Sequence, residues 1–236
     1  MKKLALAVMS LLIVVASMAQ KTYQDKNAVV RKVGSFHGIK VSHGIHLYLS
    51  QGNEEAVAVS ASRQEYIERI KTEVENGVLK IYYDTENHDW SSNGKSLKAY
   101  VSCKTLDLLK ASSGSEVDVD GTLKSGNLDL SFTSGANFQG KIESGNVKVD
   151  QNSGAEAAIS GTATSLTIEG SSGATFKGYD LTTEKCDANM SSGATMKVTV
   201  SKELSASASS GGQIYYKGTG VIREISTSSG GEVSRR

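Results

Sequence analysis

The chain of 236 residues contains no proline, only two cysteines, one tryptophan and 6% aromatic residues. The lack of proline suits continuous backbone ladders, in which every N–H is needed as a donor. Beyond residue 16, no apolar run approaches the roughly 18 residues that a membrane-spanning helix requires. Charge of one sign is not in excess either, since 26 basic residues stand against 25 acidic ones. This balance argues against a nucleic-acid partner, because phosphates demand a clustered cationic face.

The segment Met1–Ala19 has the pattern of a secretion signal. Two lysines precede an apolar run over residues 4–16, and Ser17-Met18-Ala19 supplies the small residues that a signal peptidase needs. Cleavage between Ala19 and Gln20 removes these two lysines and no acid, so the mature chain stays close to neutral. Gln20 stands where a lipoprotein would carry its cysteine. We therefore expect an exported protein, in the periplasm or on the surface of a Gram-negative-type envelope, with no membrane span after removal of the leader.

Glycine and serine are abundant, and they recur together at regular intervals. Seven Ser-Gly pairs, repeating about every 19 positions, end at Gly114, Gly135, Gly154, Gly173, Gly193, Gly211 and Gly230. We expect each glycine to form a structural corner that needs a positive φ, and each serine to satisfy the turn backbone from inside the coil.

Apolar and polar residues alternate on both sides of each corner, as in strands with one buried face. The residue three positions after each glycine is apolar: Val117, Phe138, Ala157, Phe176, Met196, Ile214 and Val233. The residue five positions before it is also apolar: Leu109, Leu130, Val149, Ile168, Ala188, Ala206 and Ile225. A strand repeat of about 19 residues cannot bury such faces alone, so the coils must stack. The sequence therefore predicts an all-β fold, a parallel β-solenoid built from a single chain.

The region before Gly114 predicts a less regular portion of the same architecture. Ser42-His43-Gly44 resembles a further corner, far ahead of Gly114 in the chain. Between the two we expect a short helix over residues 63–70 and a hairpin at Asn76-Gly77. This portion should cover the N-terminal end of the solenoid, where an open strand edge would invite aggregation.

Several motifs in this portion resemble a known family. The segments FHGIKVSHGI (36–45), NGVLKI (76–81) and LKAYV (97–101), followed by the Ser-Gly repeats, are similar to the putative auto-transporter adhesin, head GIN domain family. The resemblance implies an exported bacterial envelope protein with a right-handed parallel β-helix over residues 36–233. Residues 20–35 then form a lead-in and residues 234–236 a tail. Ser96 replaces the family's usual proline, and the shared motifs carry no catalytic or ligand residue.

Two groups of side chains raise the question of a metal site. His37, His43 and His46 are close in sequence, but strand residues three apart face opposite sides, so His43 and His46 should diverge. Asp118 and Asp120 share an outward strand face, which suffices for a weak cation site. We expect solvated side chains at both places, and neither a metal nor a cofactor.

The two cysteines should be unpaired although the protein is exported. Cys103 and Cys186 are separated by about four coils of the repeat, whereas a disulfide joins Cα atoms within ~7 Å. Cys186 falls in the same column as Leu166 and Leu204, which favours a small core residue.

Aromatic side chains beside polar ones are the candidates for ligand binding, namely Trp90, Tyr83 and Tyr215. Trp90 lies in the polar segment 84–95 after Tyr83, and a flat ring near Asp and Asn resembles a sugar-stacking surface. Alternatively, Trp90 folds back to cap the solenoid end. Near the other end, one of Tyr215 and Tyr216 should face outward and the other inward.

No paired constellation for general acid–base work is evident, which argues against an enzyme. We therefore expect a non-enzymatic, adhesin-like envelope module that binds a glycan or an envelope or host protein. Two alternatives stay open. One is a structural periplasmic component, a homo-oligomer that associates through its solenoid ends by β-augmentation. The other is a polysaccharide-active enzyme.

Overall fold

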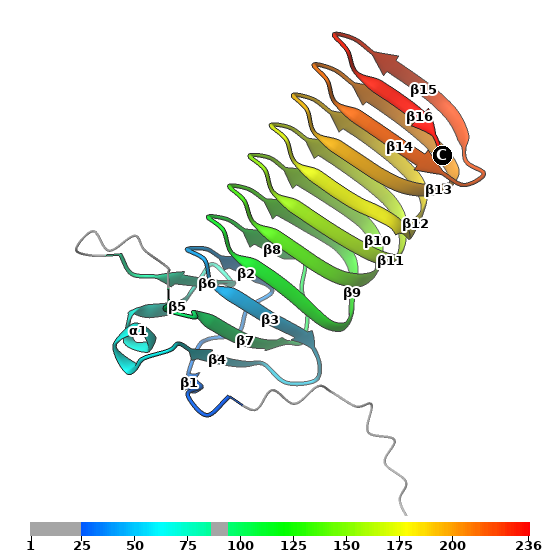
Figure 1. The fold of residues 1–236 in the computed structure, drawn as a ribbon. Helices are drawn as coiled ribbons and strands as arrows, with labels where there is room; N and C mark the ends of the chain where they lie inside the picture. Colours follow the sequence, from blue (N-terminus) through cyan, green and yellow to red (C-terminus); the bar gives the residue numbers. More distant parts are fainter. Residues whose placement is uncertain (1–24, 86–93) are drawn as a thin grey trace, which may run out of the picture.

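Parallel coils stacked along one axis form most of the molecule, for which a computed structural model describes residues 25–85 and 94–236 (Figure 1). Five long strands each bend around one coil and pair in parallel with the next. These are β9 (Glu116–Phe132), β10 (Asn137–Gln151), β11 (Glu156–Gly170), β12 (Thr175–Met190) and β13 (Thr195–Ala208). The register advances by about one repeat per coil, so that Phe138 lies beside Ala157. The predicted β-solenoid is confirmed.

The corners between these strands are tight turns in which two successive residues have positive φ. Ser134 has φ 55° and Gly135 has φ 71°, and the Ala136 N–H donates to the Thr133 carbonyl at 3.2 Å. This is the backbone pattern of a type I′ turn. All seven predicted corner glycines have φ between 69° and 77°, which confirms their role.

The role predicted for the corner serines was wrong. Their side chains are exposed on the outside of the coil, and serine itself adopts the left-handed conformation. Backbone groups satisfy the turn instead. Up to Gly211, each corner glycine N–H also donates to the serine carbonyl of the next corner, as Gly135 does to Ser153 at 3.0 Å. The turns therefore form a hydrogen-bonded ladder of their own.

The two predicted apolar columns lie in the interior and are buried in every coil except the last. Cys103 and Cys186 are both buried and unpaired, as predicted, and Cys186 lies between Leu166 and Leu204. Burial raises the pKa of Cys103 to about 11 and that of Cys186 to about 12.

The N-terminal coils do not stack in sequence order. A coil made of β2 (Gly38–Val41) and β3 (His46–Gln51) lies directly on β8 (Leu108–Ala111) and β9. Its corner is His43-Gly44, with φ 63° and 68°, and Gly44 donates to the Ser113 carbonyl. The chain then continues to β6 (Val78–Tyr83) and β7 (Lys98–Cys103), which pair on the opposite side of β2 and β3. The long segment between these two corners thus contains the outermost coil.

Antiparallel strands cover this N-terminal end, as the sequence predicts. β4 (Ala56–Ser60) pairs with β7, β1 (Val29–Arg31) pairs with β4, and β5 (Ile70–Glu75) forms the expected hairpin with β6. Helix α1 (Gln64–Arg69) lies beside them at the lower left of Figure 1. Strand β1 shows that part of the predicted lead-in, residues 20–35, belongs to the folded body.

The C-terminal end is open. β15 (Val221–Thr227) pairs with β13, and β16 (Glu232–Arg235) pairs with β14 (Gln213–Lys217). Every residue of β15 is exposed, and Ile225, expected in the core, is 42% exposed because no described coil covers it. In the described part of the chain, no helix has the length and hydropathy needed to cross a membrane.

Candidate functional site

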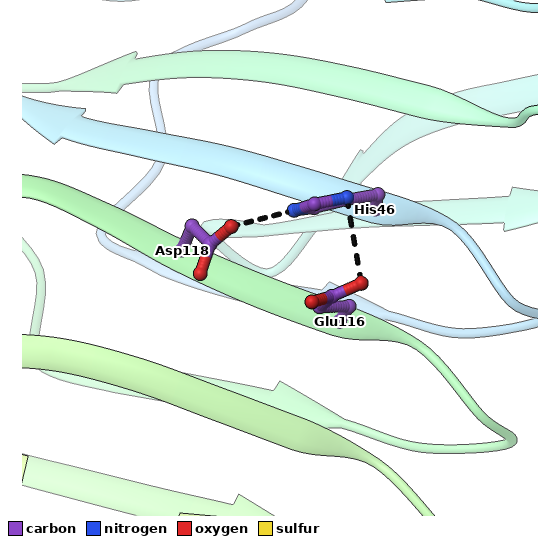
Figure 2. A group of neighbouring side chains, drawn as sticks. All are labelled: His46, Glu116 and Asp118. Atoms are coloured by element: carbon purple, nitrogen blue, oxygen red, sulfur yellow. Dashed lines mark hydrogen bonds and ion pairs between the residues drawn. The ribbon is translucent and has the colours of Figure 1, made fainter. Parts of the chain in front are cut away.

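A histidine and two carboxylates converge on the outward face of two neighbouring strands (Figure 2). His46 lies on β3, and Glu116 and Asp118 lie on β9, where successive outward residues are two apart. The register places His46 directly beside Glu116. His46 Nε2 is 2.8 Å from Asp118 Oδ2, and His46 Nδ1 is 3.5 Å from Glu116 Oε2. The imidazole therefore lies between two carboxylates.

Stacked aromatic rings hold the imidazole in place. The Tyr48 ring stacks on His46 at a centroid distance of 4.1 Å, and Tyr100 stacks on Tyr48 at 5.2 Å. The Tyr100 hydroxyl donates to Asp25 at 2.8 Å. Burial, together with the negative charges of Asp118 and Glu116, raises the pKa of Tyr48, so its phenol stays protonated at neutral pH. The three rings come from two adjacent parallel strands, which fixes their spacing.

A shallow groove of about 180 Å³ adjoins the two carboxylates. It crosses three coils, and its outward lining forms two short columns that run along the stack. The columns are Glu116, Asn137 and Glu156, and Asp118, Gln139 and Ala158. Carboxylates and carboxamides dominate the outward lining, so the groove offers both hydrogen-bond donors and acceptors.

The cluster has the donor atoms of a metal site. Both imidazole nitrogens face a carboxylate. One ligand atom from each of His46, Glu116 and Asp118 lies within 4.8 Å of the others. Imidazole nitrogen and carboxylate oxygen are both common ligands of divalent metal ions.

The candidate aromatic residues from the sequence have different outcomes. Trp90 lies outside the described residues, as do Ala19 and Gln20 of the predicted cleavage site. The prediction that Tyr83 binds a ligand is wrong. Its side chain is only 3% exposed, and the Arg69 and Lys95 cations lie 4.8 and 5.0 Å from its ring centre. This burial leaves little ring surface for a ligand.

The tyrosine pair near the C-terminal end has the expected alternation. Tyr215 faces outward and is half-buried, whereas Tyr216 faces the core and is buried. The guanidinium of Arg236 lies 4.5 Å from the centre of the Tyr215 ring. Tyr215 as a ligand-binding residue stays a prediction.

His43 and His46 diverge as predicted, and His37 lies apart from both. His37 pairs with Asp107 at 2.7 Å, His43 contacts the Ser42 hydroxyl at 2.8 Å, and His46 joins the cluster. Asp118 was expected on a solvated face with Asp120, but it contacts His46 instead.

Glu116, Tyr48 and Tyr100 were missed by sequence reasoning. A usable signal existed, because His46 follows its corner Gly44 by two residues and Glu116 follows Gly114 by two. Superposing the two corners places the histidine beside the acid. That comparison is valid only if the coil of residues 38–51 lies beside the coil that begins at residue 108. The long segment between them gives no sign in the sequence that they are neighbours.

The match to a family model supplies the identity of the chain. The model of the family "putative auto-transporter adhesin, head GIN domain" matches residues 35–220, and the chain belongs to this family. This confirms the resemblance drawn from the motifs. No curated protein matches the sequence.

Solved structures share the fold at low sequence identity. An adhesin described as putative from Bacteroides fragilis has a TM-score of 0.80 and 18% identity, over 90% of this chain and 98% of its own. A lipid-binding protein, also described as putative, from Parabacteroides distasonis has a TM-score of 0.68 at 18% identity, over 90% and 98%. An adhesin from Parabacteroides merdae, likewise described as putative, has a TM-score of 0.68 and 14% identity, over 92% of this chain and 100% of its own. At these identities the likeness shows the fold alone.

Proposed function

We propose that this protein is an exported, non-enzymatic binding module of the adhesin type, and that it binds a glycan in the groove on β9, β10 and β11. Family membership supports the adhesin character and, with the leader-like N-terminus, supports export. The observation that carries the ligand class is the groove itself, with its carboxylates and carboxamides beside a stack of tyrosine rings.

The size and shape of the groove favour one unit of a polymer over an enclosed small molecule. Its volume of about 180 Å³ is below the roughly 300–1,000 Å³ of pockets that enclose drug-sized ligands. It lies on an outward sheet face rather than in a closed cavity. Sugar hydroxyls pair with carboxylate and amide groups.

A glycan array with the mature chain tests the ligand class. The double variant Asn137→Ala/Gln139→Ala removes the central amides of the groove. Its control is Thr195→Ala/Lys197→Ala, which lies in the same two outward columns on β13. We expect the groove variant to lose about tenfold or more in affinity for the glycans bound by the wild type, and the control to keep it. No binding by the wild type, or equal loss in both variants, contradicts the proposal.

Protease shaving of intact cells tests the adhesin role separately. If the protein is digested while a periplasmic control survives, the solenoid is presented on the surface. Protection until the outer membrane is opened would place it in the periplasm and rule out direct adhesion to host or partner cells.

A second candidate function is end-to-end assembly with a second copy, favoured by the open C-terminal end. Val221, Ile222 and Ile225 are exposed there at 63, 46 and 42%, beside the free edge of β16. If β16 pairs antiparallel with β16 of a second copy so that the two Ser234 residues face each other, Glu232 lies opposite Arg236, the residue after β16, and the charges are complementary.

Sedimentation velocity over a range of concentrations tests this assembly. Ile222→Lys should abolish concentration-dependent association, because it places a charge on the open apolar end. Val30→Lys is the matched control, since Val30 is 76% exposed on β1 at the opposite, covered end. A wild type that stays monomeric at all concentrations rejects end-to-end assembly.

A further inference from the structure

The cluster of His46, Glu116 and Asp118 carries an inference that does not depend on glycan binding. Its three donors come from strands held side by side in the parallel ladder, so their spacing is set by the backbone and not by a loop. A side-chain site built on strands is more exact than one built on loops. Figure 2 shows the imidazole aligned with both carboxylates.

The surroundings of the imidazole restrict its rotation. Tyr48 covers one side of the ring, and its hydroxyl lies 3.3 Å from His46 Nδ1. Tyr48 is itself stacked on Tyr100, whose hydroxyl is bound to Asp25. Outer partners of this kind orient metal-binding histidines in known sites.

The local charge favours a cation. Two carboxylates face one imidazole, and the neighbours on β10 are the neutral Asn137 and Gln139. Lys98 lies beside His46 on β7, with its ammonium 4.0 Å from the Asp25 carboxylate. The Glu116 and Asp118 side chains are 54 and 39% exposed, which leaves an ion a path from solvent.

We infer that His46, Glu116 and Asp118 bind a divalent transition-metal ion, Zn²⁺ in particular. Ca²⁺ and Mg²⁺ take oxygen ligands, whereas an imidazole nitrogen with two carboxylates suits Zn²⁺. Three protein ligands leave a fourth position of a tetrahedral Zn²⁺ open, beside the groove that begins at the same two carboxylates. The alternative is a histidine held by carboxylates with no metal role.

Calorimetric titration of the chelator-treated mature chain with ZnCl₂ alone tests the site. We expect one equivalent to bind, and Ca²⁺ to bind at least tenfold more weakly. His46→Gln and Asp118→Asn should each weaken Zn²⁺ binding by at least tenfold. Glu116→Gln is a third variant, which keeps the test available if one of the others fails to fold.

The matched control is His37→Gln. His37 is also an exposed histidine within 2.7 Å of an aspartate, but it has one carboxylate partner instead of two. Its loss should leave Zn²⁺ binding unchanged. The inference is overturned if the wild type binds no Zn²⁺ at millimolar concentration, or if His46→Gln binds as tightly as the wild type. Because no glycan is present, this result is separate from that of the array.

Discussion

The two ends of the solenoid are finished in different ways. At the N-terminal end the chain departs from the coil order, and β1, β4 and β5 add antiparallel strands beyond the parallel ones. At the C-terminal end, the regular coils stop at β15 and β16 (Figure 1). The apolar side chains of Val221, Ile222 and Ile225 are exposed there. The irregular portion thus covers the first parallel coil with antiparallel strands, while the repeat by itself leaves the last coil uncovered.

This difference shows what a short repeat can and cannot specify. Each regular coil buries its apolar columns only against its neighbours, so its stability depends on having one on both sides. A closed end needs a segment that departs from the repeat. The irregular portion also creates the cluster of His46, Glu116 and Asp118. The coil that contains β3 lies beside β9, although the two are far apart in the chain.

The first prediction, which has the largest expected effect, compares the stability cost of a glycine substitution in the regular coils with that of one in the N-terminal portion. Gly161 has φ 107°, and a Cβ there would overlap the Ile142 carbonyl oxygen of the neighbouring coil. Gly161→Ala should cost about 3–5 kcal/mol, from backbone strain and from a clash that the ladder cannot relieve. Chemical denaturation measures the loss.

Gly77 is the matched position in the N-terminal portion. It also has a positive φ, 75°, but the atoms that its Cβ would meet belong to the His37 side chain. That side chain can rotate, so Gly77→Ala should cost only about 1–2 kcal/mol. Equal losses in the two variants would mean that the coils are no more rigid than the covered end.

The second prediction compares one core column in a middle coil and in the open one. Ile168 and Ile225 both stand five residues before a corner glycine, and they are 1 and 42% exposed. Ile168→Ala should cost about 2–5 kcal/mol, as for a buried isoleucine. Ile225→Ala should cost less than about 1 kcal/mol in the monomer. If Ile225→Ala is as costly as Ile168→Ala at low protein concentration, the end is covered in solution.

Much of the fold follows from residues that repeat, and the rest depends on contacts between coils. The corner glycines and both apolar columns are evident in the sequence, because periodic positions report which side chains share a face. The exposure of Ile225 is not evident in the sequence, because its position in the column is the same whether or not a further coil covers it. The left-handed serines were missed because Ser takes positive φ less readily than Asn or Gly.

The candidate site could be predicted only in part. Asp118 was noted as an outward acid and His46 as one of three nearby histidines, but their contact depends on which coils are neighbours. The groove likewise needs three coils in register before Asn137 and Gln139 line up beside the acids. Such properties of stacking are not contained in any one repeat.

The third prediction uses the two buried thiols as probes of local opening. Cys103 lies at the end of β7 in the N-terminal portion, and Cys186 lies inside β12 between two regular coils. Both should label slowly in the native protein, because burial raises their pKa values and blocks reagent access. We expect Cys103, in Cys186→Ala, to label at least tenfold faster than Cys186, in Cys103→Ala, which corresponds to about 1.4 kcal/mol in opening free energy. Faster labelling of Cys186 would locate the weaker region in the regular coils.

The smallest effects concern one exposed ion pair in each region, and they should respond to pH in opposite directions. The hydrogen bond and charge of Asp107 raise the pKa of His37 above 6.5, so its stabilising contribution is present below pH 6.5 and is lost as pH rises through the raised value. The hydrogen bond and charge of Arg223, followed by the charge of Lys185, lower the pKa of Glu203 below 4.5. Its contribution is present above pH 4.5 and is lost as pH falls through the lowered value.

Melting temperatures across pH can separate these two pairs. The difference in melting temperature between wild type and His37→Gln should be largest in mild acid, below the ordinary histidine pKa, and should vanish at alkaline pH. The difference between wild type and Glu203→Gln should be present at neutral pH and should vanish in strong acid. Both differences should be small and should shrink with added salt, because solvent and ions screen exposed pairs. Since Arg223 belongs to β15, loss of the Glu203 pair loosens the open end, while loss of the His37 pair loosens the contact between the β2 coil and the segment entering β8. The same pH dependence in both variants would show that neither pair acts locally, and that the two ends share one cooperative unit.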